Sequence, residues 1–404
     1  MKNVLVTATT FPRWKGDPEP GFVYFLSNSL AKRNYHMSIL VPHFFRAKKF
    51  EKMDSVYVYR FKYFPEKFQK VCYDGGIIPN FKKYFSAKMA LPFMILFELI
   101  NIKKIVKRGK INLIHAHWIL PQGFLAAIIK KFYKTPYIVT VHGGDIFPLR
   151  RNKILRRLIK FVLKNCDYCT VNSSATKKAV LEICNIKNIE LIPMGVDLET
   201  FSKGKDDNEL KKRLGIEDKF LLTVGRLTEQ KGIKYLLFSM KDVLRYFPKT
   251  KLVIIGDGIE RENLERLTKK LNLENNIIFT GKIPNEKLPD YYASADIFVS
   301  PSIIDSIGWG EGMGIVFLES IAAGTPVIGS NVGGIPDIIK NNKTGLLIEQ
   351  KNIPQIANAI KKILKDKNLG NKLVKQGKEH IKEKYSWENI TKKFENIYSI
   401  LGEQ

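Results

Sequence analysis

Two glutamates eight residues apart, Glu311 and Glu319, have the type and spacing of a ligand-binding pair. Glu311 lies in the glycine-rich segment 308–314, which predicts a loop, whereas Glu319 lies in the apolar run 315–323, which predicts a helix. Free N–H groups at a helix N-terminus attract anions, and carboxylates accept hydrogen bonds from sugar hydroxyls. An anion joined to a polyol describes a nucleotide-sugar. The plainer alternative is a buried helix with two ordinary glutamates.

A pair of cations follows another predicted strand. Arg226 and Lys231 come after the apolar run 220–224, and Gly225 and Gly232 lie on either side of them. Small residues let a diphosphate approach the backbone, and two fixed cations neutralise its charge. A lone Gly-Arg pair is weak evidence, but together with the glutamate pair it indicates the phosphate end and the sugar end of one site.

In the first half of the chain, His142 and Asp145 follow the predicted strand 137–141. Open α/β sheets bind ligands at the carboxyl ends of their strands, so both residues are site candidates. His115 and His117 have a spacing that two metal ligands could have. No third ligand is tied to them by the sequence, so no metal is expected.

The order of predicted elements indicates the fold class. The strand 4–8, a loop rich in Pro and Gly, the helix 23–33 and the strand 38–41 make a doubly wound opening, and a second βα series begins at 220–224. The first loop lacks Gly-x-Gly-x-x-Gly, so it is not a dinucleotide fingerprint. Its Gly21 either lets the backbone approach a ligand or makes a plain turn.

We therefore predict an α/β protein with two Rossmann-like doubly wound domains that face a central cleft. The N-terminal domain spans 1–200 and the C-terminal domain spans 201–384, and an amphipathic helix is expected at 386–401. The polar segment 202–209 reads as the linker.

Charge is distributed unevenly along the 404 residues. The formal net charge is +28, and residues 1–200 carry 34 Lys and Arg against 13 Asp and Glu. This half is expected to approach something anionic, such as a membrane surface or an acidic glycan. Interleaved aromatics and lysines in 65–85, and the basic amphipathic run 150–164, suit an anionic lipid surface. Each can equally cover a core edge. No nucleic-acid motif is recognised, so no nucleic-acid partner is expected.

The remaining composition indicates a cytoplasmic protein, peripheral at the inner face of the cell membrane if it binds lipid. Four cysteines are too few for a disulfide framework in a chain of this length. The chain opens directly on a strand, so no signal peptide is expected. Its most apolar stretch, 89–100, falls short of the ~18 residues of a membrane span.

Taken together, several segments resemble the large group 1 (family 4) retaining glycosyltransferases, which have the GT-B fold. Phosphatidylinositol mannosyltransferases and many polysaccharide and lipid-linked sugar transferases belong to that family. The segments that carry the resemblance are Val224-Gly-Arg-Leu-Thr-Glu-Gln-Lys-Gly232, Glu311-Gly-Met-Gly through Glu319, Ala323-Gly-Thr-Pro-Val-Ile328, Gly333-Gly-Ile-Pro336 and Thr344-Gly-Leu-Leu347. The likeness is specific in 220–350 and looser before 110.

The resemblance implies a role for each matching residue. Arg226 and Lys231 would hold the donor diphosphate, Glu319 the ribose hydroxyls, and Glu311 the transferred sugar. His142 would lie near the sugar and Gly21 near the β-phosphate. Asp145 matches a position that is often acidic in relatives, and we assign it to acceptor binding. The resemblance also implies that the N-terminal domain 1–200 binds the acceptor and is completed by the final helix 386–401, and that the C-terminal domain 201–384 binds the donor. Backbone groups complete the implied donor site, at Ile283 for the base and at Met313, Gly314, Ile315 and Val316 for sugar and phosphate.

The activity implied is metal-independent hexosyl transfer with retention, from a nucleoside-diphosphate sugar to a lipid-linked or glycan acceptor. Arg226, Lys231 and the helix N-terminus would stabilise the departing diphosphate. No cofactor is expected besides the donor as co-substrate, and the sequence contains no Asp-x-Asp. A nucleotide-sugar epimerase of the same architecture and a non-catalytic binder of nucleotide or anionic glycan are the alternatives.

Overall fold

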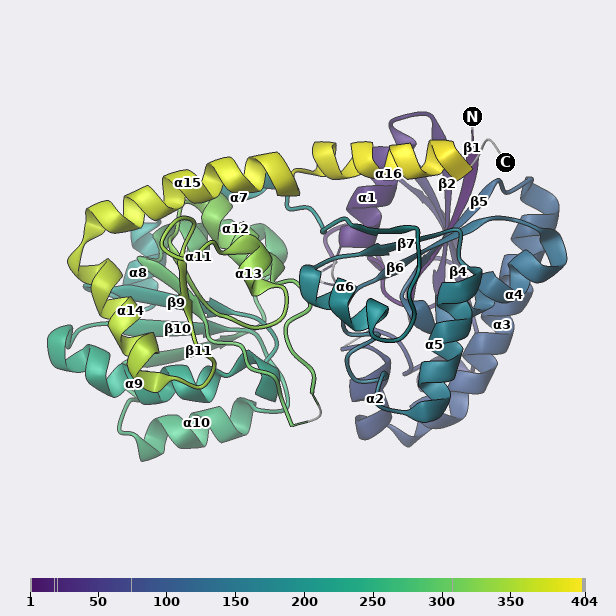
Figure 1. Cartoon of the computed structure of the whole chain (residues 1–404). Helices are drawn as coiled ribbons and strands as arrows, with labels where there is room; N and C mark the ends of the chain where they lie inside the picture. Colours follow the sequence, from purple (N-terminus) through teal and green to yellow (C-terminus); the bar gives the residue numbers. More distant parts are fainter. Residues whose placement is uncertain (1, 18, 20, 74, 307, 402–404) are drawn as a thin grey trace. The chain divides into compact units, whose positions relative to one another are not determined.

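The structure, a computed structural model, describes residues 2–17, 19, 21–73, 75–306 and 308–401. The chain divides into two compact units. The first contains Met1–Asn172, Thr176–Met194 and Trp387–Gln404, and the second contains Ser173–Ala175 and Gly195–Ser386. Each unit is an α/β sandwich built on one central sheet (Figure 1).

In the described residues of the first unit, eight strands form a sheet in the order β3-β4-β2-β1-β5-β6-β7-β8. The pairs are parallel except for β3, which runs antiparallel to β4 at the edge. Nearly every position of the central strands is buried, as helices on both faces of a parallel sheet require. The strands are β1 Lys2–Thr7, β2 Tyr35–Pro42, β3 Phe50–Met53, β4 Val56–Phe61, β5 Leu113–His117, β6 Tyr137–Val141, β7 Tyr168–Val171 and β8 Ile189–Leu191.

Helices cover both faces of this first sheet. On one face α1 packs against α16, the last helix of the chain, and both contribute to a core with alternate residues of β1 and β2. On the other face α3, α4 and α5 lie side by side (Figure 1). The helices are α1 Phe22–Ala31, α2 Ile77–Lys83, α3 Phe85–Gly109, α4 Phe124–Tyr133, α5 Lys153–Asn165, α6 Ser174–Leu181 and α16 Trp387–Leu401.

In the described residues of the second unit, six parallel strands take the order β11-β10-β9-β12-β13-β14. The order reverses beside β9, which is where a doubly wound sheet opens a ligand crevice at its carboxyl edge. The strands are β9 Phe220–Val224, β10 Lys251–Ile255, β11 Ile277–Gly281, β12 Ile297–Ser300, β13 Val327–Ser330 and β14 Leu346–Ile348.

One face of this sheet is covered by α9, α10 and α14, whose leucines and isoleucines join the strands in one buried core. The other face carries α12, which packs against α7, α11 and α15. The helices are α7 Leu198–Ser202, α8 Asn208–Arg213, α9 Ile233–Tyr246, α10 Arg261–Lys270, α11 Leu288–Ser294, α12 Ile315–Ala323, α13 Ile335–Ile338, α14 Ile353–Lys365 and α15 Lys367–Tyr385.

Three features of the fold differ from the elements expected. The antiparallel edge strand β3 was not predicted. The apolar stretch 89–100 is the middle of the 25-residue helix α3. The polar linker 202–209 overlaps two short helices, α7 and α8, whose N-caps Asp197 and Asp207 accept hydrogen bonds from the first-turn N–H groups. None of the helices in the described residues has the length and hydropathy needed to span a bilayer.

Candidate functional site

Lys231 and Glu311 meet at the carboxyl edge of the second sheet, although 80 residues separate them in sequence. Lys231 ends the short turn that leads from β9 to α9, and Glu311 lies in the loop before α12. The Lys231 Nζ donates to the Glu311 Oε2 at 2.6 Å, and both side chains are mostly buried. Arg226, in the same loop as Lys231, is exposed. The edge thus presents two cations and a carboxylate.

The loop that carries Glu311 is fixed by a close backbone approach. Gly333, with φ of +57°, passes so near that an added Cβ would lie 1.9 Å from the Glu311 carbonyl oxygen. The Gly334 N–H donates to that same oxygen at 3.0 Å. Because a side chain at position 333 would collide with the backbone, the Gly333-Gly334 pair sets the position of Glu311.

Helix α12 begins directly after this loop, at Gly314. Gly314 has φ of +92° and, lacking a side chain, leaves the first-turn N–H groups without a side-chain cap. Met313 is buried beneath the loop, while Ile315 and Val316 are partly buried at the helix start. The helix therefore presents backbone donors and the positive end of its dipole beside Lys231 and Glu311.

Glu319 lies about one turn further along α12. Its Oε2 accepts a hydrogen bond from the Tyr292 hydroxyl at 2.8 Å. Burial raises the pKa of the Glu319 carboxyl to about 7, although the Tyr292 hydrogen bond and the Lys231 charge both lower it. Ile283, in the loop after β11, lies at the same sheet edge two strands from β9. The carboxyl edge of the second sheet thus carries every residue expected to hold the donor in this half of the chain.

In the first unit, His142 follows β6 and packs into a stack of rings. Its Nε2 lies 3.0 Å from the His117 Nδ1, and the two imidazoles are nearly parallel with centroids 5.2 Å apart. Phe22 and Trp118 lie against the same ring, at 4.9 and 5.0 Å between centroids. Phe22 directly follows Gly21, the N-cap of α1, so the loop glycine and His142 lie near one another in this unit.

The imidazoles in this stack are uncharged. His117 stacks on His115, whose ring nitrogens lie 2.6 Å from the Thr140 and Tyr398 hydroxyls. Burial lowers the pKa of His142 to about 3 and that of His115 to about 3, and lowers the pKa of His117 well below its usual value. A neutral imidazole both donates and accepts hydrogen bonds, as a sugar hydroxyl does. These imidazoles are therefore suited to hydroxyls rather than to phosphates.

Asp145 is buried and supports the loop that carries His142. One carboxylate oxygen accepts from the His142 N–H at 2.9 Å, and the other accepts from the Ile119 N–H at 2.7 Å. Burial raises the pKa of Asp145 to about 6 against these backbone hydrogen bonds. The acid ties the ends of β5 and β6 together. Its role in acceptor binding stays a prediction.

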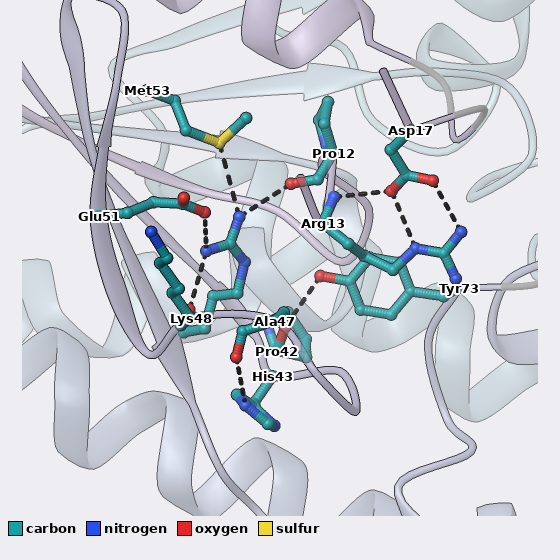
Figure 2. Close-up of polar contacts among 11 residues, drawn as sticks. Pro12, Arg13, Asp17, Pro42, His43, Ala47, Lys48, Glu51, Met53 and Tyr73 are labelled. Atoms are coloured by element: carbon teal, nitrogen blue, oxygen red, sulfur yellow. Dashed lines mark hydrogen bonds and ion pairs between the residues drawn. The ribbon is translucent and has the colours of Figure 1, made fainter. Parts of the chain in front are cut away.

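The loop that leads to Gly21 is held by two buried ion pairs (Figure 2). The Arg13 guanidinium binds Asp17 through two hydrogen bonds of 2.8 and 2.7 Å and lies over the ring of Phe44, with 4.4 Å to its centroid. Arg60 of β4 pairs with Glu51 at 2.6 Å and donates to the Pro12 carbonyl at 2.9 Å. Both ion pairs therefore hold the loop in place.

Sequence reasoning missed three neighbours of the predicted residues. His117 ends β5 and Trp118 directly follows it, beside β6, so the rule that ligands lie at the carboxyl ends of adjacent strands could have found them. Tyr292 gave no such signal, because its partner Glu319 is 27 residues away on another helix.

Two family models match the chain. The model described as Glycosyl transferases group 1 matches residues 206–380, and the model described as Glycosyltransferase Family 4 matches residues 22–200. They cover the residues of the second sheet edge and of the first, respectively.

Curated relatives include an uncharacterized glycosyltransferase of Methanocaldococcus jannaschii, 33% identical over 73% of this chain and 76% of its own length. Another is the GDP-mannose-dependent alpha-(1-6)-phosphatidylinositol monomannoside mannosyltransferase of Mycobacterium tuberculosis, 25% identical over 97% of both chains.

Solved structures of the same fold cover nearly all of the chain. Sucrose-phosphate synthase from Thermosynechococcus elongatus matches with a TM-score of 0.81 at 23% identity, over 99% of both chains. Anabaena HepE in complex with UDP-glucose matches with a TM-score of 0.75 at 16% identity, over 99% of this chain and 100% of its own. The two Rossmann-like units have the GT-B fold of these glycosyltransferases. With the family models and the relatives, this places the chain among the group 1 (family 4) glycosyltransferases.

Proposed function

We propose that this glycosyltransferase moves a hexose, with retention and without a metal, from a nucleoside-diphosphate sugar to the hydroxyl of a lipid-linked or polysaccharide-precursor acceptor. The observation that carries the proposal is the meeting of Lys231, Glu311 and the uncapped start of α12 at one sheet edge. Cation, carboxylate and helix N-terminus are the partners that a diphosphate and a sugar require.

Each residue of the second unit takes one part of the donor. Arg226 and Lys231 bind the diphosphate, together with the backbone N–H groups at Ile315 and Val316. Glu319 accepts hydrogen bonds from the ribose hydroxyls, and Glu311 and the backbone at Met313 and Gly314 hold the sugar. The backbone at Ile283 borders the base. The UDP-glucose bound by the HepE structure supports a nucleotide-sugar as the donor class.

The hard step is departure of the nucleoside diphosphate from an oxocarbenium-like centre. Negative charge then grows on the leaving phosphate. Lys231 and the start of α12 stabilise this charge without a reorganisation cost, because they are already in position. These fixed charges do the work that a metal ion does in other transferases, which supports a metal-independent reaction. The acceptor attacks on the face that the diphosphate leaves, and the leaving phosphate takes its proton, so the configuration is retained.

In the first unit, His142 hydrogen-bonds a hydroxyl of the transferred hexose and Gly21 lets the β-phosphate approach the backbone. Asp145 keeps His142 in place and borders the acceptor. The M. tuberculosis relative is named for a phosphatidylinositol monomannoside, which supports a lipid-linked acceptor. We accordingly place the enzyme in the cytoplasm, peripheral at the inner face of the cell membrane.

The test begins with purified protein and a panel of nucleoside-diphosphate sugars, screened by thermal shift. A donor at 100 times its dissociation constant stabilises the folded state by ~2.7 kcal/mol. Transfer from the selected donor is then followed by NMR of the anomeric proton, with and without EDTA. Retention and full activity in EDTA are expected. Inversion, or loss of activity that Mg²⁺ restores, would contradict the mechanism. Conversion of the sugar without acceptor would indicate an epimerase.

A further inference from the structure

The outward face of helix α3 exposes a stripe of large apolar side chains. Phe85 is 76% exposed, Met89 53%, Phe93 44% and Leu96 51%. Their spacing of three and four residues places them on one side of the helix. The opposite side is buried and carries Ala87, Ala90, Met94 and Glu98. The helix is therefore anchored in the first unit by one face and offers a second apolar face to the surroundings.

Neighbouring aromatic rings widen this stripe. Phe64 packs on Phe93 with ring centroids 5.4 Å apart, and Phe68, half exposed, packs on Phe64. Single exposed apolar residues are ordinary, but a contiguous group of this size marks an interaction site. We call the residues Phe68, Phe85, Met89, Phe93, Leu96 and Phe97 the α3 apolar face.

The surface charge along 77–112, the segment that carries α3, is of one sign, and Glu66 beside Phe68 is paired with Lys62. Residues 77–112 contain eight lysines and arginines and a single acid, Glu98. Glu98 is fully buried and hydrogen-bonded by Gln122, so it contributes nothing to the surface. Beyond Phe97 the outward side of α3 continues as Lys103, Lys104 and Lys107, all exposed. Exposed apolar side chains beside lysines are typical of a membrane-surface helix, because the rings enter the headgroup layer and the lysines bind anionic lipid.

We propose that the α3 apolar face docks on an anionic lipid bilayer. The apolar side chains enter the boundary between headgroups and acyl chains, while Lys103, Lys104 and Lys107 bind lipid phosphates. A second copy of the chain is a poorer occupant, because an isologous contact would bring two strongly basic surfaces together. This surface would bring the enzyme to a membrane-bound acceptor. Only that role rests on the proposed function, because docking itself is argued from the surface of α3.

The test is sedimentation of the full chain with phosphatidylcholine vesicles, with and without phosphatidylglycerol. Wild type is expected to bind the anionic vesicles about tenfold more tightly, and high salt removes the difference. Phe85→Ser with Leu96→Ser reduces binding about tenfold, because apolar area no longer enters the bilayer. The matched control, Phe238→Ser with Tyr246→Ser, removes two exposed apolar side chains of the second unit and leaves binding unchanged.

A second pair of variants tests the charges. Lys103→Ala with Lys104→Ala weakens binding to anionic vesicles only, whereas Lys269→Ala with Lys270→Ala, on the exposed side of α10, has no effect. Equal binding by the Phe85/Leu96 variant and wild type overturns the proposal. The proposal is also overturned if light scattering shows that wild type is a dimer and that Phe85→Ser with Leu96→Ser dissociates it. Donor binding by thermal shift on the same preparations separates the two proposals, since vesicle binding can fail while the donor still binds.

Discussion

The two sheet edges use charge in opposite ways. In the second unit the ion pair between Lys231 and Glu311 lies at the edge itself, next to the start of α12. In the first unit the ion pairs of Arg13 and Arg60 are buried in the support of a loop, and the edge presents neutral imidazoles and aromatic rings. One edge carries an ion pair, and the other carries neutral rings.

A substitution at either place should therefore change a different property of the protein. A charge at an edge works on the ligand, so its removal should reduce activity more than stability. A buried charge that supports a loop works on the fold, so breaking its pair leaves an uncompensated charge and should reduce stability. Four predictions test this contrast, in order of decreasing effect.

Lys231→Ala should reduce kcat by about 10²–10³, because a preorganised cation is lost where the leaving phosphate develops charge. Thermal unfolding should change little. The measurement is steady-state transfer with the donor found by screening. Lys234→Ala, three residues further and exposed, is the control and should keep wild-type activity. An unfolding midpoint that drops as far as the activity would remove the contrast between the edges.

Asp17→Asn should lower the free energy of unfolding by about 3 kcal/mol, because it leaves the buried Arg13 guanidinium without its carboxylate. Burial alone would raise the pKa of Asp17, but the hydrogen bonds and charge of Arg13 outweigh it and lower the pKa. The pair therefore stabilises above pH ~4 and loses this effect as acid protonates Asp17. The difference from wild type should shrink in acid.

Urea unfolding at several pH values measures this effect. Asp206→Asn, which breaks the exposed pair with Lys211, is the control and should change stability little. A kcat loss in Asp17→Asn without loss of stability would show that the buried pair acts on the ligand.

His142→Ala should reduce kcat/KM roughly 10- to 100-fold, since one hydrogen bond to a sugar hydroxyl is worth about 1–3 kcal/mol when its partner is left unpaired. Wild-type kcat should show no histidine titration between pH ~5 and ~8, because the pKa of His142 is lowered to about 3. His36→Ala, a partly exposed histidine stacked on Tyr57, is the control. A titration near pH 6.5 that disappears in His142→Ala would show that His142 carries charge at lower pH and would contradict the contrast.

Donor binding should strengthen several-fold between pH ~6 and ~8, because ionised Glu319 accepts two ribose hydroxyls and the protonated form does not. Its pKa is raised to about 7, so the folded state holds the proton more tightly and loses stability as pH rises through that value. Calorimetric titration with the donor measures the binding. Glu319→Gln should bind the donor equally well at all pH values. If its donor affinity still depended on pH, another group would be the one that titrates.

The second unit was the more predictable part of the fold. The strand 220–224 and the helix 315–323 have the bounds expected from apolar runs and glycines. Helix α3 was missed because both of its sides are apolar, so it has no helical periodicity to detect. Strand β3 was missed because it is short, half exposed and antiparallel at an edge.

The candidate site followed the same pattern. Glu311 and Lys231 were expected at one site because both lie beside helix starts after strands, and their contact confirms that they come together. The stacking of the imidazoles depends on the register of β5 against β6, which places His117 beside Thr140, two residues before His142. The position of His117 at a strand end could be predicted, but this register could not. Asp145 was predicted from its position alone, and only the structure shows that backbone N–H groups occupy both of its oxygens.

The contact between Lys231 and Glu311 also bears on turnover. Lys231 already has an anionic partner within the chain, so under the proposed function a diphosphate would displace the Glu311 carboxylate in order to bind. After transfer, Glu311 would recover the lysine as the nucleoside diphosphate leaves. A carboxylate that competes with the product for Lys231 should therefore limit product inhibition.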